Sequence, residues 1–167
     1  MREMRLHKRE VTDIKELRKI LQECQVMRLG TMDEEGMMVV PVNFGFELDE
    51  ETRKLRLFFH SAREGRKADA FARNPIVAVE MDCRHGLIKG NYSCAYSYSF
   101  ASIMGTGTLK KAAAAEEKIY GLTRILDHCA PGEKVEFSPE ALERTDVYTI
   151  EVTHFTGKCR MPKKQEG

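Results

Sequence analysis

The ten residues from 58 to 67, FFHSAREGRK, are the part of this sequence best suited to chemistry. We expect a strand to end at His60 and a helix to begin with Arg66 and Lys67 in its first turn. Cations at the start of a helix oppose its dipole, so they are favourable there only if an anion binds beside them. Backbone N–H groups, the Ser61 hydroxyl and the two cations could then share one phosphate, each charge-assisted hydrogen bond contributing about 1.5–3 kcal/mol. The alternative, which these residues support equally, is a solvent-exposed basic helix whose cations pair with nearby acidic side chains.

His60 is the candidate for proton transfer in this stretch. An imidazole titrates near neutral pH, so it can donate a proton to a reduced substrate under physiological conditions. The simpler alternative is a histidine that only closes the end of a strand, and the residues alone favour it. We therefore keep His60 as a candidate proton donor.

A proline inside an expected strand is the second informative feature. Pro41 lies in the run VVPVNFG at 39–45. Proline removes a ladder donor, which favours an edge strand or a bulge. Backbone groups beside it then stay free to meet the polar edge of a flat ring, and the amide of Asn43 can both donate and accept there. A plain edge strand is the alternative.

Aromatic and hydroxyl side chains alternate in the run YSYSFAS at 96–102. Such a strip can line a flat ring or a seam between two copies of the chain. It can equally reflect aromatic packing across neighbouring strands. The residues do not separate these alternatives.

Strands make up most of the structure expected to position these residues. Apolar residues that alternate with period two predict strands at 26–32, 37–46, 54–60, 76–82, 95–110 and 147–155. Helical spacing predicts helices at 12–24, 65–73 and 112–129. The segment 84–92 is expected to be a loop or a broken strand. Phe58 interrupts the polar face of its strand, which indicates that this face is covered too.

These elements predict a mainly β (α+β) fold with peripheral helices. Short turns between consecutive strands favour an antiparallel sheet, and six strands with one apolar face tend to close into a barrel. Helices do not alternate regularly with strands, so a doubly wound α/β fold is disfavoured. The length of 167 residues suits a single domain, 1–167, and we expect flexible ends at 1–10 and 161–167.

The composition argues against several classes of function. The net charge of +1 creates no overall field that would attract nucleic acid or an anionic membrane. No apolar run is long enough to span a bilayer, and the charged N-terminal residues lack the apolar region of a signal peptide. We expect a cytoplasmic protein with no nucleic-acid or membrane partner.

The five cysteines and five histidines show no spacing typical of a metal site. Neither C-x-x-C nor H-E-x-x-H occurs, so we expect no bound metal. Reduced, mostly buried thiols are the simple interpretation. A redox role for Cys94 or Cys159 is the alternative.

These motifs, in this order, resemble the pyridoxamine-phosphate-oxidase-like flavin-binding split barrels. Within that family the chain is most similar to the branch that includes the 5-nitroimidazole-resistance (Nim-type) proteins. The resemblance runs from about residue 9 to residue 160. The matching pieces are MRLGT at 27–31, VPVNFG at 40–45, FHSA at 59–62, GRK at 65–67, NP at 74–75, SIMGTG at 102–107 and TGK at 156–158.

The resemblance implies a six-stranded split β-barrel that forms a homodimer, with FMN, or less expectedly FAD, at the subunit interface. It implies that phosphate binds near the start of the second helix and that the partner subunit contributes residues from 98–102 and from its basic tail. His60 matches the histidine that Nim-type proteins place beside the flavin. The implied cofactor-binding residues are Arg28, Leu29, Gly30, Pro41, Val42, Asn43, Phe59, His60, Ser61, Ala62, Arg66, Lys67, Ser99, Phe100 and Ser102.

Two departures from the family pattern limit what carries over. Ala101 stands where relatives often have a basic residue, and the segment 84–93 matches no family motif. Loops of this kind commonly set substrate specificity, so the resemblance leaves the substrate open.

The function implied is a flavin-dependent oxidoreductase that reduces a small acceptor of the nitroaromatic or quinone type. NADH or NADPH would supply the electrons and bind only transiently, since no G-x-G-x-x-G fingerprint occurs. A flavin-binding carrier or redox sensor without turnover is the alternative. Pyridoxamine-phosphate oxidation would need a second phosphate clamp, for which only Lys158 and Arg160 are available. Haem or a deazaflavin in place of FMN is a further alternative.

Overall fold

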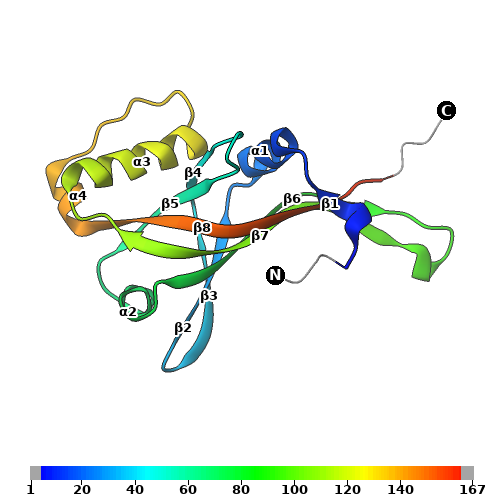
Figure 1. The fold of residues 1–167 in the computed structure, drawn as a ribbon, viewed down its shortest axis with the longest axis horizontal. Coiled ribbons are helices and arrows are strands. Elements are labelled where there is room, and N and C mark those ends of the chain that lie inside the picture. Colours follow the sequence, from blue (N-terminus) through cyan, green and yellow to red (C-terminus); the bar gives the residue numbers. More distant parts are fainter. Residues whose placement is uncertain (1–4, 163–167) are drawn as a thin grey trace.

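The computed structural model describes residues 5–162, which are built around one antiparallel sheet of eight strands (Figure 1). The strands are β1 (Glu10–Val11), β2 (Met27–Asp33), β3 (Gly36–Val42), β4 (Gly45–Leu48), β5 (Leu55–Ala62), β6 (Ile76–Ile88), β7 (Ser97–Lys111) and β8 (Thr145–Arg160). The helices are α1 (Ile14–Glu23), α2 (Arg66–Arg73), α3 (Ala115–Cys129) and α4 (Pro139–Arg144), and short 3-10 turns are found at His7–Arg9 and Ser93–Ala95.

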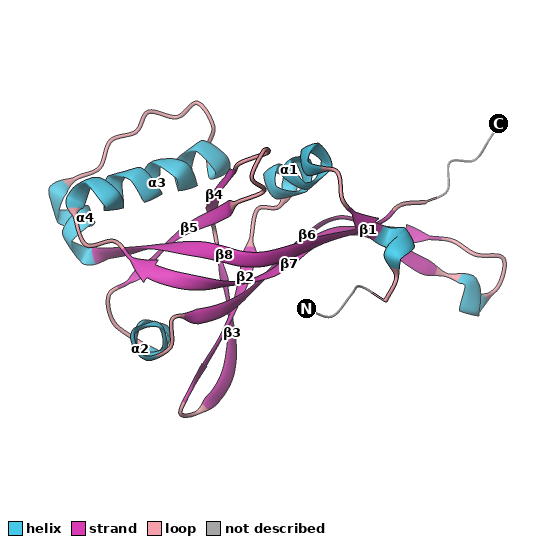
Figure 2. Ribbon diagram, viewed as in Figure 1, coloured by secondary structure: helices cyan, strands magenta, loops and turns pink. Residues whose placement is uncertain are grey.

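The strand order shows that the sheet curls into a split barrel. The order is β3-β2-β6-β7-β8-β5-β4, and β1 pairs with β8 at the side. The two ends of this path, β3 and β4, are consecutive in the chain, yet no ladder joins them in the described residues, so the barrel stays open there. Figure 2 shows the strands curving together with the helices at the periphery. The mainly β fold with peripheral helices is confirmed.

The number of strands differs from the six that the sequence predicts. The expected strand at 37–46 divides into β3 and β4, and β1 adds two residues at the start. Phe44 explains the division. Its ring is fully buried 4.6 Å from the ring of His128 on α3, and its carbonyl oxygen lies 2.7 Å from Nδ1 of the same histidine. The chain therefore leaves the β2 ladder at this point and turns toward α3.

The segment 84–92, expected to be a loop or a broken strand, is a bulged strand up to Ile88 followed by a loop. β6 continues to Ile88 after a bulge and forms an arm with the start of β7, which extends beyond the barrel at the right of Figure 1. Arg84 occupies the bulge with a positive φ of 59°. Its guanidinium binds Glu16 at 2.5 Å and Glu23 at 2.7 Å, both on α1. These contacts hold the bulge against α1.

The core fills the barrel, and α1 closes one end of it. The inner faces of the strands and the buried face of α1 supply its fully buried large side chains, namely Leu17, Ile20, Leu21, Met27, Leu29, Phe44, Leu55, Leu57, Phe59, Met81 and Ile103. Asp13 caps α1 by accepting a hydrogen bond from the Lys15 backbone N–H at 3.0 Å. The helix predicted at 12–24 is confirmed.

α3 covers the opposite face of β5, as the position of Phe58 predicts. Phe58 is buried and its ring lies 5.8 Å from that of Tyr120. A Cβ atom added at Gly121 would lie 2.6 Å from Val147, which shows how closely the helix approaches the sheet. α4 was not predicted; Ser138 caps it by accepting a hydrogen bond from the Ala141 N–H at 3.2 Å.

The two chain ends that we expected to be flexible, 1–10 and 161–167, lie only partly within the described residues. The turn at His7–Arg9 and Glu10, the first residue of β1, lie within the end expected to be flexible, 1–10, while residues 1–4 and 163–167 lie outside the described range. Between residues 5 and 162, the structure holds no helix that is both long and apolar enough to cross a membrane. In the same range, no group of three or more His, Cys, Asp or Glu side chains is arranged to hold a metal ion.

Candidate functional site

The start of α2 has the open geometry that the sequence predicts for an anion site. Gly65 precedes the helix with a φ of 112°, a conformation that side-chain-bearing residues rarely adopt. No side chain caps the first-turn N–H groups within the described part of the chain. These donors are therefore left for solvent or for a ligand.

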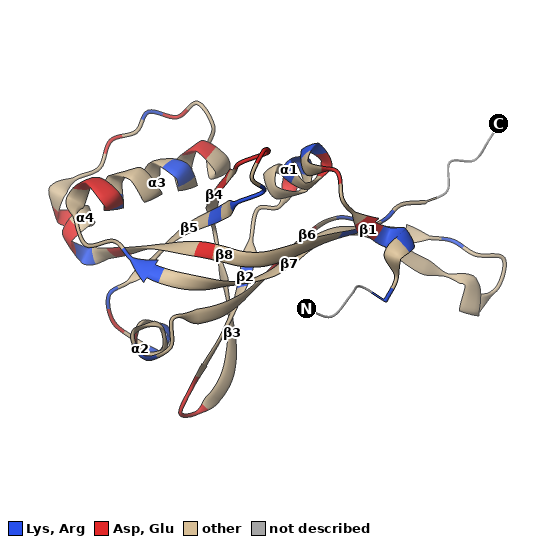
Figure 3. Ribbon diagram, viewed as in Figure 1, with Lys and Arg blue, Asp and Glu red and all other residues tan. Residues whose placement is uncertain are grey.

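Arg66, the first cation of the predicted clamp, is already engaged within the protein. Its guanidinium binds both carboxylate oxygens of Asp33, at 2.7 and 2.9 Å, and lies 3.5 Å from Glu35. The hydrogen bonds from Arg66 lower the pKa of Asp33 to about 2. The pair joins α2 to the acidic turn between β2 and β3, which Figure 3 shows in red at the tip of the hairpin.

Lys67 is left as the cation available to a ligand at this helix start. It is half-buried, and no ion pair to it occurs among residues 5–162. The Ser61 hydroxyl, which we expected to bind the phosphate, is buried and donates instead to the carbonyl oxygen of Ala62 at 3.0 Å. The anion donors present are therefore Lys67 and the backbone N–H groups after Gly65.

The residues on either side of the barrel split include most of the other predicted positions. Gly45 pairs with Phe58. β5 continues past this pair to Ala62, so His60 lies beyond the end of β4, while Asn43 lies in the turn between β3 and β4. His60 is exposed, whereas the Asn43 amide nitrogen donates to the carbonyl oxygen of Gln25 at 3.1 Å.

β3 is an edge strand, as Pro41 predicts. It pairs only with β2 among the described strands, and Pro41 lies directly opposite Arg28 in that ladder. Both side chains are exposed on the outer face of the sheet. The backbone of β3 is thus accessible from the split.

Several predicted site residues face the core or bond locally. Leu29 and Phe59 are fully buried, and Val42 packs partly against the core, so only their backbone groups can contact a ligand. The Ser99 hydroxyl donates to the carbonyl oxygens of Arg84 and Gly86 at 3.0 and 3.1 Å, which stabilises the bulge.

A groove of about 650 Å³ crosses the outer face of β2, β6, β7 and β8. It is lined by Arg28, Gly30, Val39, Ala78, Val79, Glu80, Ser102, Met104, Gly105, Thr106, His154, Thr156 and Lys158. The sequence predicted only Arg28, Gly30 and Ser102 of these as ligand contacts, and it named Lys158 as part of a basic tail.

The register of the sheet arranges this groove in cross-strand rows, which lie about 6.6 Å apart because two residues separate them along each strand. The first row is Gly30, Ala78, Thr106 and His154; the second is Arg28, Glu80, Met104 and Thr156; the third is Asp82, Ser102, Lys158 and, on β1, Glu10. The Gly30–Ala78 end of this first row carries no large side chain, and a Cβ at Gly30 would only just touch that of Ala78 at 3.5 Å.

Charged groups cluster at the Arg28 side of the groove. Arg28 donates to Glu80 at 3.0 Å and to Asp82 at 2.6 Å, and Nε2 of His85 lies 2.8 Å from Asp82. Burial raises the pKa of Asp82, but the hydrogen bonds from Arg28 and His85 outweigh it and hold this pKa below its usual value. No sequence motif marked His85, because its contact with Asp82 depends on the bulge between Cys83 and Gly86.

A profile of known sequences, described as pyridoxamine 5'-phosphate oxidase, matches residues 13–159. The chain belongs to the pyridoxamine 5'-phosphate oxidase family. A comparison with curated proteins finds no match.

Solved structures of the same fold include proteins with different described roles. A candidate 5-nitroimidazole antibiotic resistance protein from Bacteroides thetaiotaomicron is 29% identical, with 90% of this chain and 86% of that chain covered and a TM-score of 0.76. The flavocytochrome Anf3 from Azotobacter vinelandii is 21% identical, with 96% and 73% covered and a TM-score of 0.80. An FAD and heme binding protein from Mycobacterium smegmatis is 18% identical, with 93% and 76% covered and a TM-score of 0.79.

This member of the pyridoxamine 5'-phosphate oxidase family also exposes several large apolar side chains beside the groove. Met32, Met37, Val39, Ile76 and Met104 lie on β2, β3, β6 and β7, and Met37 and Val39 are 84% and 65% exposed. Patches of this kind mark surfaces that bind other molecules.

All five cysteines are free thiols. Only Cys24 is fully buried, so the expectation of mostly buried thiols is wrong in detail. Burial raises the pKa of Cys24 far above its usual value, which keeps this thiol protonated and unreactive.

Proposed function

We propose that this protein is a homodimeric flavoprotein that binds FMN and reduces a small aromatic acceptor with electrons from NADH or NADPH. The observation that carries the proposal is the uncapped start of α2 beside Lys67, found in a chain of the pyridoxamine 5'-phosphate oxidase family. The 29% identity to a candidate nitroimidazole-resistance protein supports a nitroaromatic acceptor.

The phosphate of FMN would bind to the backbone N–H groups that follow Gly65 and to the Lys67 ammonium. Arg66 would assist only by sharing its guanidinium with Asp33. The positive end of the helix dipole adds to this attraction. The donor set therefore fits a phosphate monoester.

The flavin ring would lie along the split and the neighbouring sheet face. Pro41 and Arg28 are opposite each other there, and the Gly30–Ala78 end of the first row, which carries no large side chain, leaves room for a planar ring. Backbone groups of the edge strand β3 are available to hydrogen-bond the pyrimidine edge of the ring.

The homodimer would form through the exposed apolar face of β2, β3, β6 and β7. Covering side chains as exposed as Met37 and Val39 supplies the driving force for association. A second copy on this face would also close the groove, so that water is excluded from the bound ring and the acceptor.

The bound flavin supplies the hydride chemistry. His60 is exposed on β5 beyond its last pair with β4, and it would deliver the proton that accompanies the hydride. Transient binding of NADH or NADPH at the open groove needs no dinucleotide fold. FAD in place of FMN would need room for an adenylate beyond the phosphate site.

The test is anaerobic mixing of the purified, flavin-loaded protein with NADH or NADPH, followed by addition of a nitroaromatic or a quinone. Bleaching of the flavin band by the nicotinamide and its return with the acceptor are expected. A yellow protein that no nicotinamide bleaches would identify a flavin carrier or sensor instead of a reductase.

A further inference from the structure

We infer that Asp146 is a positioning residue for the FMN phosphate, because it fixes the loop 63–65 that leads into α2 and its first N–H groups. The inference rests on the proposed function, since it concerns the phosphate end of the same site. Asp146 lies on β8 directly opposite Ser61, one residue before β5 ends at Ala62. Its carboxylate is buried, with only 1% of the residue exposed.

Two cations from different elements balance the charge of Asp146. Nζ of Lys111, at the end of β7, lies 2.5 Å from Oδ2, and Nε of Arg63 lies 3.7 Å from Oδ1. The Ser61 hydroxyl gives no help, since it donates to the carbonyl oxygen of Ala62. Within the described part of the chain, neither oxygen of Asp146 accepts a hydrogen bond of good geometry. A buried carboxylate is costly unless cations compensate it, so Asp146 draws Arg63 toward β8.

Arg63 is one of two anchors of the loop before α2. Its Nη1 also donates to the carbonyl oxygen of Glu143 on α4, at 2.9 Å. Three positions later, Arg66 binds Asp33 at the end of β2. The two arginines therefore hold the chain before and after Gly65, where φ is 112°. Because glycine itself restricts the backbone little, these anchors set the direction of the N–H groups that follow.

Anchoring of this loop benefits the phosphate rather than the flavin ring. A loop that is ordered before the ligand arrives loses less conformational entropy on binding. The N–H groups after Gly65 and the Lys67 ammonium are the groups that would receive the phosphate. Riboflavin has the same ring without the phosphate, so its affinity should not depend on Asp146.

The competing arrangement is a direct contact between Arg63 and the phosphate, since this side chain is 57% exposed. The two arrangements predict opposite effects when the charge of Asp146 is removed. A direct phosphate ligand would be released from its ion pair and would bind FMN more tightly. A loop anchor would be lost, and FMN would bind more weakly.

The experiment compares the dissociation constants of FMN and riboflavin, measured by fluorescence titration of the full-length apoprotein. Asp146→Asn keeps the size of the side chain and removes its charge. We expect FMN to bind about tenfold more weakly, as the misplacement of one charge-assisted hydrogen bond allows, and riboflavin to bind as it does to the wild type. A merely structural role would weaken the binding of both flavins alike.

Should Asp146→Asn fail to fold, the double variant Asp146→Asn/Lys111→Met keeps the same test. It removes one charge of each sign, and neutral replacement of a buried ion pair is often tolerated. Arg63→Met should reproduce the tenfold loss for FMN alone, whereas Arg63→Lys can still pair with Asp146 and should keep most of the affinity.

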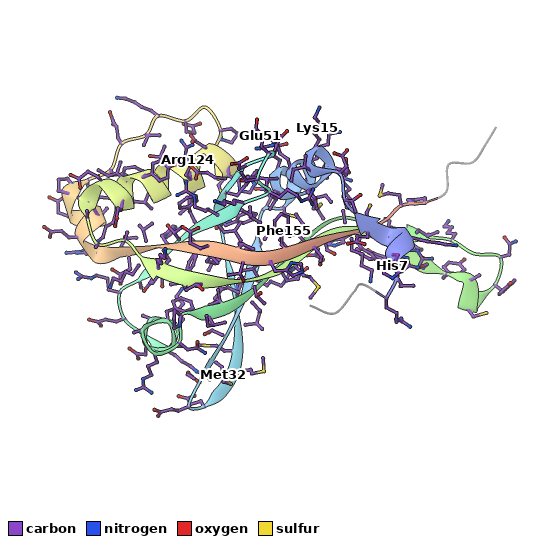
Figure 4. All side chains as sticks on the ribbon, in the orientation of Figure 1. His7, Lys15, Met32, Glu51, Arg124 and Phe155 are labelled. Atoms are coloured by element: carbon purple, nitrogen blue, oxygen red, sulfur yellow. The ribbon has the colours of Figure 1, made fainter. Side chains whose placement is uncertain are left out.

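Two lysine variants control for the loss of a charge. Lys110→Met is the matched control, because Lys110 is exposed on β7 beside Lys111. Lys15→Met is the distant control, because Lys15 is exposed on α1, on the opposite side of the molecule from Met32 in Figure 4. Neither should change the ratio of the two dissociation constants.

Unchanged or tighter FMN binding by Asp146→Asn or by Arg63→Met would overturn the inference, and so would an equal loss for riboflavin. Equal affinity of the wild type for FMN and riboflavin would contradict the phosphate site itself, and the inference with it. Bleaching of the wild-type flavin by NADH is recorded separately, so failure of the proposed reductase function is recognised independently.

Discussion

Arg66 donates two hydrogen bonds to the Asp33 carboxylate, with Nε 2.7 Å from Oδ2 and Nη2 2.9 Å from Oδ1. The arginine that the sequence suggests for phosphate binding thus joins α2 to the β2–β3 turn. Its neighbour Lys67 remains for the ligand. The start of α2 therefore combines a structural cation with a binding cation.

The Asp33–Arg66 pair should make the free energy of unfolding depend on pH between about 4 and 2. The pKa of Asp33 is lowered from 3.8 to about 2, so its ion pair stabilises the folded state fully above pH 4 and is lost as the pH falls toward 2. Thermal unfolding of the wild type and Asp33→Asn should differ at pH 6 and converge near pH 2. A difference that persists at pH 2 would contradict this assignment.

Lys67→Met should weaken FMN binding about tenfold to hundredfold, since it removes one charge-assisted contact to phosphate. Arg66→Ala combined with Lys67→Ala should leave a folded dimer that has lost most of its FMN affinity. Fluorescence titration of the apoprotein with FMN measures both variants. Lys15→Met serves as control, and unchanged affinity in the double variant would place the phosphate elsewhere.

Gly65→Ala should lower the free energy of unfolding by about 1 kcal/mol and also weaken FMN binding, because φ at 112° is strained for alanine and the N–H groups after it would move. Gly132 offers a matched control, since it has a positive φ of 87° in the loop after α3. Gly132→Ala should destabilise the protein without altering FMN affinity. Equal effects of both variants on FMN binding would argue against a site at α2.

Val39→Asp should convert the dimer to a monomer, because it places a charge within the exposed apolar face. Ile119→Asp changes a side chain on α3 that is 40% exposed and should leave the dimer intact. Sedimentation velocity distinguishes the two states. A monomeric wild type, or a Val39→Asp variant that stays dimeric, would exclude this interface.

Local patterns predicted most elements because each rests on neighbours in the chain. The alternation of Leu55, Leu57 and Phe59 indicated β5, and the turn after Asp33 indicated the β2–β3 hairpin. The break between β3 and β4 was missed, because Phe44 turns there to meet His128, which is 84 residues away. The broken strand that the sequence offers as one alternative at 84–92 is found, because Arg84 at the bulge of β6 reaches back to α1.

The site was harder to predict than the fold, since distant pairings define it. GRK at 65–67 marked the α2 start correctly, but Asp33, the partner of Arg66, lies 33 residues earlier. The groove arises from the register that aligns Arg28, Glu80 and Thr156 across strands. The sequence of one strand alone does not show which residues of other strands lie beside it in such a cross-strand row.

Absorption spectroscopy of the purified protein during anaerobic addition of NADH or NADPH tests the central claim most directly. The account predicts a flavin spectrum, release of FMN on denaturation, and bleaching by one of the two nicotinamides. A colourless protein that fails to take up added FMN, or a haem spectrum in its place, would contradict it.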